Sequence, residues 1–256
     1  MYKRQEKVVL ARAVDIEFPE AIDPRLVAAR LIDLSANRDG FIADLSPAGR
    51  PGAMLVGSSP EVLVKRQGST VSAFPLAGSS PRRASAAEDH LAGQDLLHSS
   101  KDLHEHAFVV DHLRRALTPL CERLDIPDVP QLISTNEMWH LGTPISGTLK
   151  DKDLTALELA LAVHPTPAIC GTPAEAAQAL IETAETDRGF YAGAVGWCDS
   201  SGDGEYMVAI RCAEVAGDGL SARAWAGGGI VGDSDAQAEL EETTAKLRTI
   251  LKALSL

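Results

Sequence analysis

Three side chains near the end of the sequence have the types and spacing of a face that binds a cation and an anion. Glu239, Glu242 and Lys246 follow one another at i, i+3 and i+7, so on a helix they would share one face. Carboxylate oxygens are hard ligands that suit Mg²⁺, and a lysine one turn further on supplies a charge for an anion. The same spacing also suits a solvated face with an ordinary Glu-to-Lys pair, and spacing alone does not separate the two.

Glycines precede this helix in a pattern that nucleotide-binding proteins use. Gly227, Gly229 and Gly232 spell G-x-G-x-x-G between a predicted strand and the predicted helix. A dinucleotide site also needs a second strand after the helix, with an acidic residue for the ribose, and this sequence has none. We therefore expect a glycine-walled turn that leads into the helix, not a dinucleotide site.

Glu105 is a second candidate ligand, between two histidines of a predicted helix. The H-E-x-x-H motif of zinc proteases would need histidine at position 108, where Phe108 stands. His104 and His106 point to different helix faces, so we do not expect them to chelate one metal together. A helix with one buried polar residue is an equally good interpretation of this stretch.

Two ionisable residues stand in apolar stretches that are predicted to be buried strands. Lys7 begins "KVVLAR", and Glu61 follows "GSSP". A charged residue in such a strand usually lies at a sheet edge or in an ion pair. If both side chains lose contact with water, desolvation favours their neutral forms, which is what an acid–base pair requires.

Composition narrows the class of protein. The chain has 256 residues, 45% of them hydrophobic, and a formal charge of -12, so it has material for a large core and little attraction for nucleic acid or an anionic membrane. No apolar run approaches the ~20 residues of a membrane helix. The cysteines form no C-x-x-C pair, which favours a reducing cytoplasm; they are Cys121, Cys170, Cys198 and Cys212.

These residues need elements to position them, and the pattern predicts an α+β fold with an antiparallel sheet. We expect a single domain over residues 6–256, preceded by an artefactual leader at 1–5, "MYKRQ". The predicted strands are 7–18, two or three within 52–79, one in 135–149, and a meander over 191–231. The predicted helices are 25–36, one long helix over 88–117, 156–163, 173–186 opened by Thr172, and the closing helix.

Nine stretches occur in the order seen in chorismate-utilising enzymes. They are "KVVLAR", "GSSPEVLV", "PLAGSSPRR", "KDLHEHAFVVDHL", "PQLISTNEMWHLGTPISG", "HPTPAICGTP", "YAGAVGWCDSSGDGEYMVAIRCA", "AGGGIV" and "EETTAKL". Together they cover nearly the whole chain from Lys7 onward. The set most resembles the siderophore-type isochorismate synthases, which feed 2,3-dihydroxybenzoate synthesis. The resemblance implies the fold of chorismate-utilising enzymes, with large antiparallel sheets and helices packed outside them. It also implies a further N-terminal segment that this sequence lacks.

The resemblance also implies a reaction, a Mg²⁺-dependent conversion of chorismate to isochorismate. Water adds at ring C2 while the C4 hydroxyl leaves. Lys7 is similar to the general base that activates the water, and Glu61 to the general acid that protonates the departing hydroxyl. Glu105 and Glu242 match the Mg²⁺ carboxylates, with Glu239 nearby through water.

Other positions match residues that bind the substrate. They are Arg211 and Lys246 for its carboxylates, Gly78, Ser79 and Gly227 as backbone-lined contacts, Ala168, Ile169 and Tyr191 around the ring, and His140. Chorismate is a dianion, so a protein of charge -12 must gather cations around it. Those cations would also disfavour an ammonium on Lys7, whereas Glu61 must be kept protonated by apolar surroundings or a proton-sharing partner.

Several alternatives stay open within this resemblance. Salicylate synthases add pyruvate elimination to the same first step, and anthranilate and aminodeoxychorismate synthases use ammonia in place of water. Lys7 at the base position resembles the enzymes that use water. The apolar pair Ala168–Ile169 resembles the enzymes that release isochorismate. A menaquinone-type isochorismate synthase performs the same reaction. An inactive fragment that only binds ligand or metal is the non-enzymatic alternative. We expect a cytoplasmic monomer whose partner is chorismate, with no nucleic acid and no membrane.

Overall fold

The computed structural model describes residues 6–256, so the predicted leader at 1–5 lies outside the described residues. In that part of the chain the strands form three antiparallel sheets. The first sheet has the order β11 (Gly171–Thr172), β1 (Lys7–Glu17), β15 (Ser221–Ile230), β14 (Cys212–Val215), β3 (Met54–Ser58) and β2 (Gly40–Asp44). The second has the order β12 (Ala194–Cys198), β13 (Gly204–Val208), β4 (Val62–Gln67), β5 (Thr70–Phe74), β10 (Ile145–Leu149) and β7 (Cys121–Asp125). The third has the order β6 (Leu76–Pro81), β9 (Met138–Gly142) and β8 (Gln131–Ser134).

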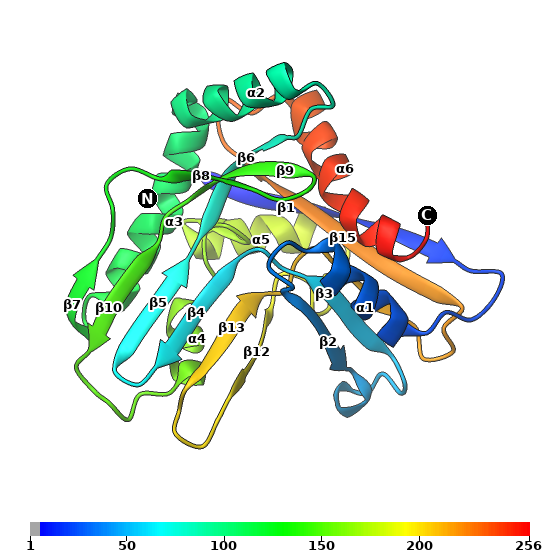
Figure 1. The fold of residues 1–256 in the computed structure, drawn as a ribbon, viewed down its shortest axis with the longest axis horizontal. Coiled ribbons are helices and arrows are strands. Elements are labelled where there is room, and N and C mark those ends of the chain that lie inside the picture. Colours follow the sequence, from blue (N-terminus) through cyan, green and yellow to red (C-terminus); the bar gives the residue numbers. More distant parts are fainter. Residues whose placement is uncertain (1–5) are drawn as a thin grey trace.

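Helices cover the outsides of these sheets, as Figure 1 shows. They are α1 (Pro24–Leu34), α2 (Ala86–His98), α3 (Ser100–Leu117), α4 (Ala156–Val163), α5 (Ala174–Ala184) and α6 (Ala236–Ala253), with a 3₁₀ turn at Ser46–Ala48. Helices α1 and α6 pack on the first sheet, against β3 and β15, and α4 packs on the second, against β4 and β13. The predicted α+β class with antiparallel sheets is confirmed.

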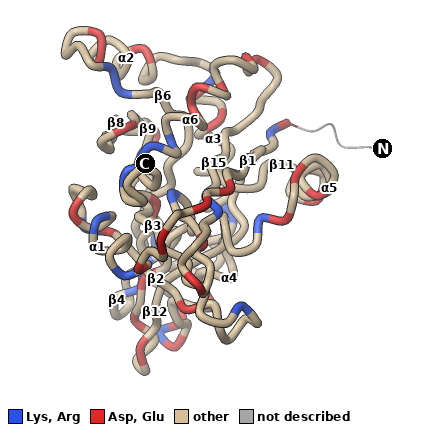
Figure 2. Tube along the Cα trace, turned by 90° about the vertical axis from the view of Figure 1, so that its right-hand side faces the viewer, with Lys and Arg blue, Asp and Glu red and all other residues tan. Residues whose placement is uncertain are grey.

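Two large apolar cores and a small third cluster around Val8, Cys170 and Ala177 hold these layers together. The larger core lies beneath α3 and α4 and includes Leu113, Leu117, Leu159 and Ile145. The second lies between α1, α6 and the first sheet. Lys, Arg, Asp and Glu are spread along the helices and loops in Figure 2 and do not gather on one face. No helix within residues 6–256 is long and apolar enough to cross a bilayer.

The predicted long helix over 88–117 is wrong, because the structure divides it at Ser99. The backbone of Ser99 is extended there, with φ -69° and ψ 110°. Its side chain accepts a hydrogen bond from the backbone N–H of Asp102, so it caps the start of α3. Serine favours such caps over helix interiors, and the spacing of the leucines does not reveal this local competition.

The predicted meander over 191–231 is also wrong, although all its strands exist. Strands β12 and β13 belong to the second sheet, whereas β14 and β15 belong to the first. The chain crosses between the two sheets at Arg211, whose backbone has φ 52°. Sequential strands usually pair with each other, but β13 and β14 do not. Strand β13 pairs with β4, whereas β14 pairs with β15 and β3.

Smaller expectations also differ, and the 135–149 stretch holds two strands, β9 and β10, and not one. The 52–79 stretch holds four strands, β3 to β6, and not two or three. Helix α5 has Pro173 as its N-cap, and Thr172 lies in β11. Gly227 and Gly229 lie inside β15, so the predicted glycine-walled turn is largely a strand; only Gly232 is in the turn before α6.

The larger core makes a stability prediction. Leu113 of α3 is 1% exposed in the core, so we expect Leu113→Ala to lower the free energy of unfolding by about 2–5 kcal/mol. Leu161 of α4 is 70% exposed, and Leu161→Ala should change it by less than about 0.5 kcal/mol. Urea unfolding of both variants measures this, and equal losses would contradict the assigned core.

Candidate active site

A cavity of about 60 Å³ lies where the three sheets meet, and predicted site residues line it. Every predicted residue except Lys7 and Glu239 is in its wall. Lys7 lies directly behind the wall, with its Nζ 3.0 Å from Oε1 of Glu105. Glu239 lines an adjoining groove that also reaches Ser79 and Glu242. The structure therefore gathers at one place residues that are spread over most of the sequence.

Glu61 supplies a buried carboxyl to this cavity. It lies just before β4, in the turn after β3, and not inside a strand as expected. It is 4% exposed, and burial raises its pKa to about 7. A hydrogen bond from the backbone of Leu76 and the charges of Lys7, Lys246 and Arg211 lower the pKa, but burial outweighs them. Such a carboxyl keeps its proton up to about neutral pH.

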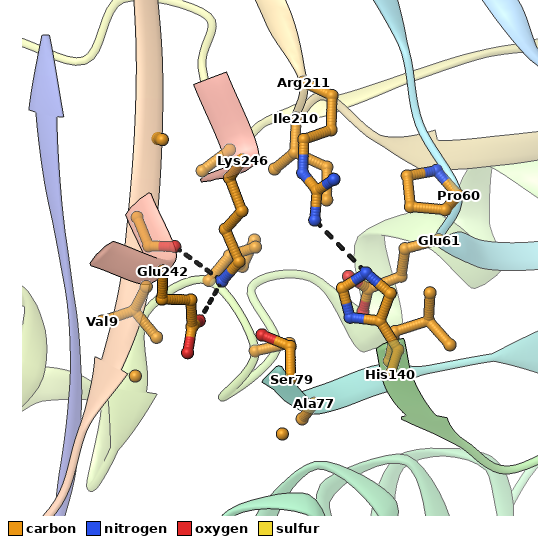
Figure 3. A pocket seen from close by; sticks show the side chains of 18 of the residues that line it. Val9, Pro60, Glu61, Ala77, Ser79, His140, Ile210, Arg211, Glu242 and Lys246 are labelled. Atoms are coloured by element: carbon orange, nitrogen blue, oxygen red, sulfur yellow. Dashed lines mark hydrogen bonds and ion pairs between the residues drawn. The ribbon is translucent and has the colours of Figure 1, made fainter. Parts of the chain in front are cut away.

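Arg211 and His140 stand beside Glu61, as Figure 3 shows. Nη2 of Arg211 lies 3.3 Å from Nε2 of His140, and both residues are buried. Burial, followed by the charges of Arg211 and Lys246, lowers the pKa of His140 well below its usual value. The imidazole is therefore neutral, and Arg211 remains the cation on this side of the cavity.

Glu242 and Lys246 face them from α6 on the other side of the view in Figure 3. Nζ of Lys246 donates to Oε1 of Glu242 at 2.5 Å and to the carbonyl of Gly227 at 2.9 Å. Burial raises the pKa of Glu242, but the charge of Lys246 and hydrogen bonds from Lys246 and Ser79 outweigh it, so the pKa is lowered. Glu242 is thus an ionised carboxylate whose side chain is only 14% exposed, and the solvated-face interpretation of this helix is wrong.

Each of the three predicted metal carboxylates has a lysine partner. Glu105 pairs with Lys7, Glu242 with Lys246, and Glu239 with Lys101 at 2.8 Å. Glu105 and Glu239 are 8% and 7% exposed. A buried carboxylate is stable only when it is paired or protonated, so the lysines stabilise this acidic cluster.

Two glycines of β15 leave the room that these carboxylates occupy. A Cβ on Gly229 would lie 2.1 Å from Oε1 of Glu105 and 2.9 Å from Cε of Lys7. A Cβ on Gly228 would lie 3.0 Å from Oε2 of Glu239 and 3.8 Å from Oε1 of Glu242. These glycines therefore let side chains from other elements come close to a strand, whereas the sequence pattern predicted that glycines here form a turn.

The donor chemistry here suits a hard divalent cation. Oε2 of Glu239 is buried and lacks a hydrogen-bond partner among the described residues. Within residues 6–256, however, no group of three or more His, Cys, Asp or Glu side chains is arranged to hold a metal. Each of these carboxylates is paired with a lysine, so a divalent cation bound here would have to replace these partners.

Some residues of the site escaped the sequence analysis. Trp225 lines the cavity and stacks on Tyr191, with ring centroids 6.0 Å apart. Strand alternation was the missed signal, because Trp225 shares a strand face with Gly227 and Gly229. Lys101 lies one helical turn before Glu105, a spacing that also places them side by side.

His106 makes hydrogen-bond contacts with the backbone and with a threonine. Its Nδ1 lies 3.1 Å from the carbonyl of Ala77 and its Nε2 lies 2.7 Å from Oγ1 of Thr143. Burial lowers the pKa of His106 to about 4. A neutral His106 therefore ties α3 to β6 beside Gly78, as the structural alternative for this helix expected.

Comparisons with known proteins agree with this geometry. Residues 2–255 match the protein family described as "Chorismate binding enzyme". The chain is 52% identical over 250 residues to "Putative isochorismate synthase MenF" of Mycobacterium tuberculosis, covering 97% of the chain and 67% of that protein. It is 47% identical over 251 residues to isochorismate synthase DhbC of Bacillus subtilis, covering 97% and 63%.

A solved structure gives the same result. The crystal structure of "putative 2,3-dihydroxybenzoate-specific isochorismate synthase, DhbC from Bacillus anthracis" matches with a TM-score of 0.94 and 43% identity. The match covers 98% of this chain and 67% of that chain. The chain belongs to the chorismate-binding enzyme family, and it spans about two thirds of the length of these relatives. The predicted family and its fold are confirmed.

The raised pKa of Glu61 makes a prediction about pH. The carboxyl has a pKa of about 7 when folded, against an ordinary value of 4.5, so the folded state disfavours its ionisation. Relative to Glu61→Gln, which stays neutral, the wild type should lose on the order of 3 kcal/mol of unfolding free energy between about pH 4.5 and pH 7. Urea unfolding at pH 5 and pH 8 measures the difference.

Glu122→Gln is the matched control, since Glu122 is exposed on β7. Its difference from the wild type should hardly change over the same pH range. The raised pKa of Glu61 would be contradicted if the difference in unfolding free energy between Glu61→Gln and the wild type were the same at pH 5 and pH 8.

Proposed function

We propose that this chain converts chorismate to isochorismate by adding water at C2 as the C4 hydroxyl leaves. The observation that carries the proposal is the asymmetry of the cavity: a buried carboxyl with a raised pKa on one side, and carboxylates with lysines on the other. That arrangement offers an acid for a departing hydroxyl and cations for a dianionic ring. The relatives named above are isochorismate synthases.

Lys7 and Glu61 are the proposed base and acid. Glu61 donates its proton to the C4 oxygen, because burial keeps that proton on the carboxyl near neutral pH. Lys7 accepts a proton from the water, for which its amine must be neutral. Its Nζ lies 3.0 Å from Oε1 of Glu105, so the proposed base is in contact with a proposed metal ligand.

The proposed cofactor is Mg²⁺, and Glu105, Glu239 and Glu242 would hold it. When bound, it supplies positive charge that neutralises the ring carboxylate and polarises the conjugated system. Glu239 contributes the buried oxygen without a hydrogen-bond partner described above. Glu242 stays ionised, because Lys246 keeps its pKa low against the effect of burial.

The remaining residues would hold and orient the substrate. Arg211 and Lys246 bind carboxylates from opposite sides of the cavity, as Figure 3 allows the reader to follow. Neutral His140 donates or accepts a hydrogen bond next to Arg211. Backbone contacts come from Gly78, Ser79 and Gly227, while Ala168, Ile169 and the Tyr191–Trp225 stack form the ring pocket.

We infer that the product serves 2,3-dihydroxybenzoate and hence siderophore synthesis, which the DhbC relatives support. The apolar pair Ala168–Ile169 brings no side-chain hydroxyl to the ring pocket, which favours release of isochorismate over conversion to salicylate. Residues 6–256 are the proposed catalytic domain, acting as a cytoplasmic monomer.

Incubation with chorismate tests the reaction. We expect isochorismate to form when Mg²⁺ is present and to be absent when EDTA replaces it. Chromatography against isochorismate, salicylate and, with ammonium added, anthranilate standards identifies the product. Salicylate or anthranilate as the main product would replace the proposed activity, and a folded protein that makes no product would favour the ligand-binding alternative.

Gly229→Ala tests whether the glycine of β15 positions the base and its neighbour. The new methyl group would overlap Oε1 of Glu105 and crowd Lys7, so we expect kcat/KM for chorismate to fall by roughly 100-fold, the scale of a misplaced catalytic group. Gly232→Ala is the control, because a Cβ there meets nothing within 4 Å. Similar rates for both variants would contradict the assignment, provided that circular dichroism shows both folded.

A further inference from the structure

Lys101 is a partly buried cation to which neither the sequence nor the proposed mechanism gives a role. It lies on α3, and its side chain is 27% exposed. Its Nζ donates to Oε1 of Glu239 at 2.8 Å, in the first turn of α6. The pair links two helices that each carry a proposed metal ligand, since Glu105 is on α3 and Glu242 on α6.

Glu239 is held on one oxygen only. Oε1 accepts from Lys101 and, at 2.8 Å, from Oγ of Ser234. Oε2 is the buried oxygen without a hydrogen-bond partner, and it lies next to Gly228, where Oε1 of Glu242 also approaches. A buried carboxylate oxygen without a donor costs free energy. This oxygen therefore lies on the side of Gly228 that Glu242 also approaches, while Lys101 holds the other oxygen of Glu239.

The pair also lies in a groove that adjoins the cavity. An open groove of about 700 Å³ runs between α2 and α6 and is lined by Lys101, Asp102 and Glu239. Ser79 and Glu242 line both this groove and the enclosed cavity. A cation that enters by the groove meets the Lys101–Glu239 pair beside Glu242.

We propose that Lys101 is a displaceable counter-ion of the metal site: it neutralises Glu239 when no divalent cation is bound and releases it when one binds. The inference rests on the proposed function in that it needs Glu239 to be a metal ligand. The Lys101 ammonium holds a carboxylate that the metal needs and repels an incoming cation. It therefore lowers the affinity for Mg²⁺ and, in exchange, stabilises the metal-free protein against repulsion among its carboxylates.

Isothermal titration of the whole chain with MgCl₂, without chorismate, tests the inference. We expect Lys101→Met to bind Mg²⁺ roughly five- to tenfold more tightly than the wild type. Without metal, the Tm of Lys101→Met should be lower than the Tm of the wild type. Saturating Mg²⁺ should raise the Tm of Lys101→Met by more than it raises the Tm of the wild type. Lys101→Gln should change the affinity in the same direction, which covers the case in which the methionine variant does not fold.

Lys252→Met is the matched control. Lys252 lies on α6 and, like Lys101, pairs with a buried carboxylate, here Glu137, which is not in the cavity wall. It should bind Mg²⁺ within about twofold of the wild type, as expected when only a remote charge is removed. An equal gain in Lys252→Met would mean that overall charge explains the effect, and would overturn the assignment to Lys101.

The remaining outcomes separate this inference from the proposed reaction. Unchanged or weaker Mg²⁺ binding in both Lys101 variants overturns the inference, even if the wild type makes isochorismate. A wild type that binds no Mg²⁺ also overturns it. Tighter binding in the Lys101 variants, together with a wild type that makes no isochorismate, supports the counter-ion and overturns the reaction alone.

Discussion

The neutralisation of buried carboxylates is the constraint on which the site depends. Glu105 approaches Gly229 of β15, Glu239 and Glu242 approach the neighbouring Gly228, and lysines from β1, α3 and α6 each pair with one of these carboxylates. Carboxylates of like charge in a poorly solvated place repel one another unless such partners are present. Strand β1 and helix α6 pack along β15, and α3 reaches the same strand through the side chain of Glu105.

The other side of the cavity follows the opposite rule. Glu61 also lies near cations, yet burial dominates and its carboxyl keeps a proton. Arg211 is brought beside it because the chain changes sheets at this residue, between β13 and β14. The cavity thus joins one neutral acid to one ionised cluster, and this difference in environment gives similar side chains different chemistry.

Local signals in the sequence accounted for some elements and failed for others. Helix α4 has the predicted bounds, 156–163, because Thr155 and Glu158 form a capping box that competes with nothing distant. The break at Ser99 is also local, but leucine spacing alone does not reveal it. The assignment of β13 and β14 to different sheets depends on partners more than a hundred residues away, β4 and β3, which no local pattern specifies.

By itself, the sequence determined which residues could do chemistry, since ordered motifs and residue types carry that information, and the structure places these residues around one cavity. Only the tertiary structure decided how their charges are balanced. The pairing of Lys101 with Glu239 joins positions 138 residues apart, and the raised pKa of Glu61 depends on what covers it. Burial and ion pairing are properties of the packed chain, because they arise from neighbours that folding brings together.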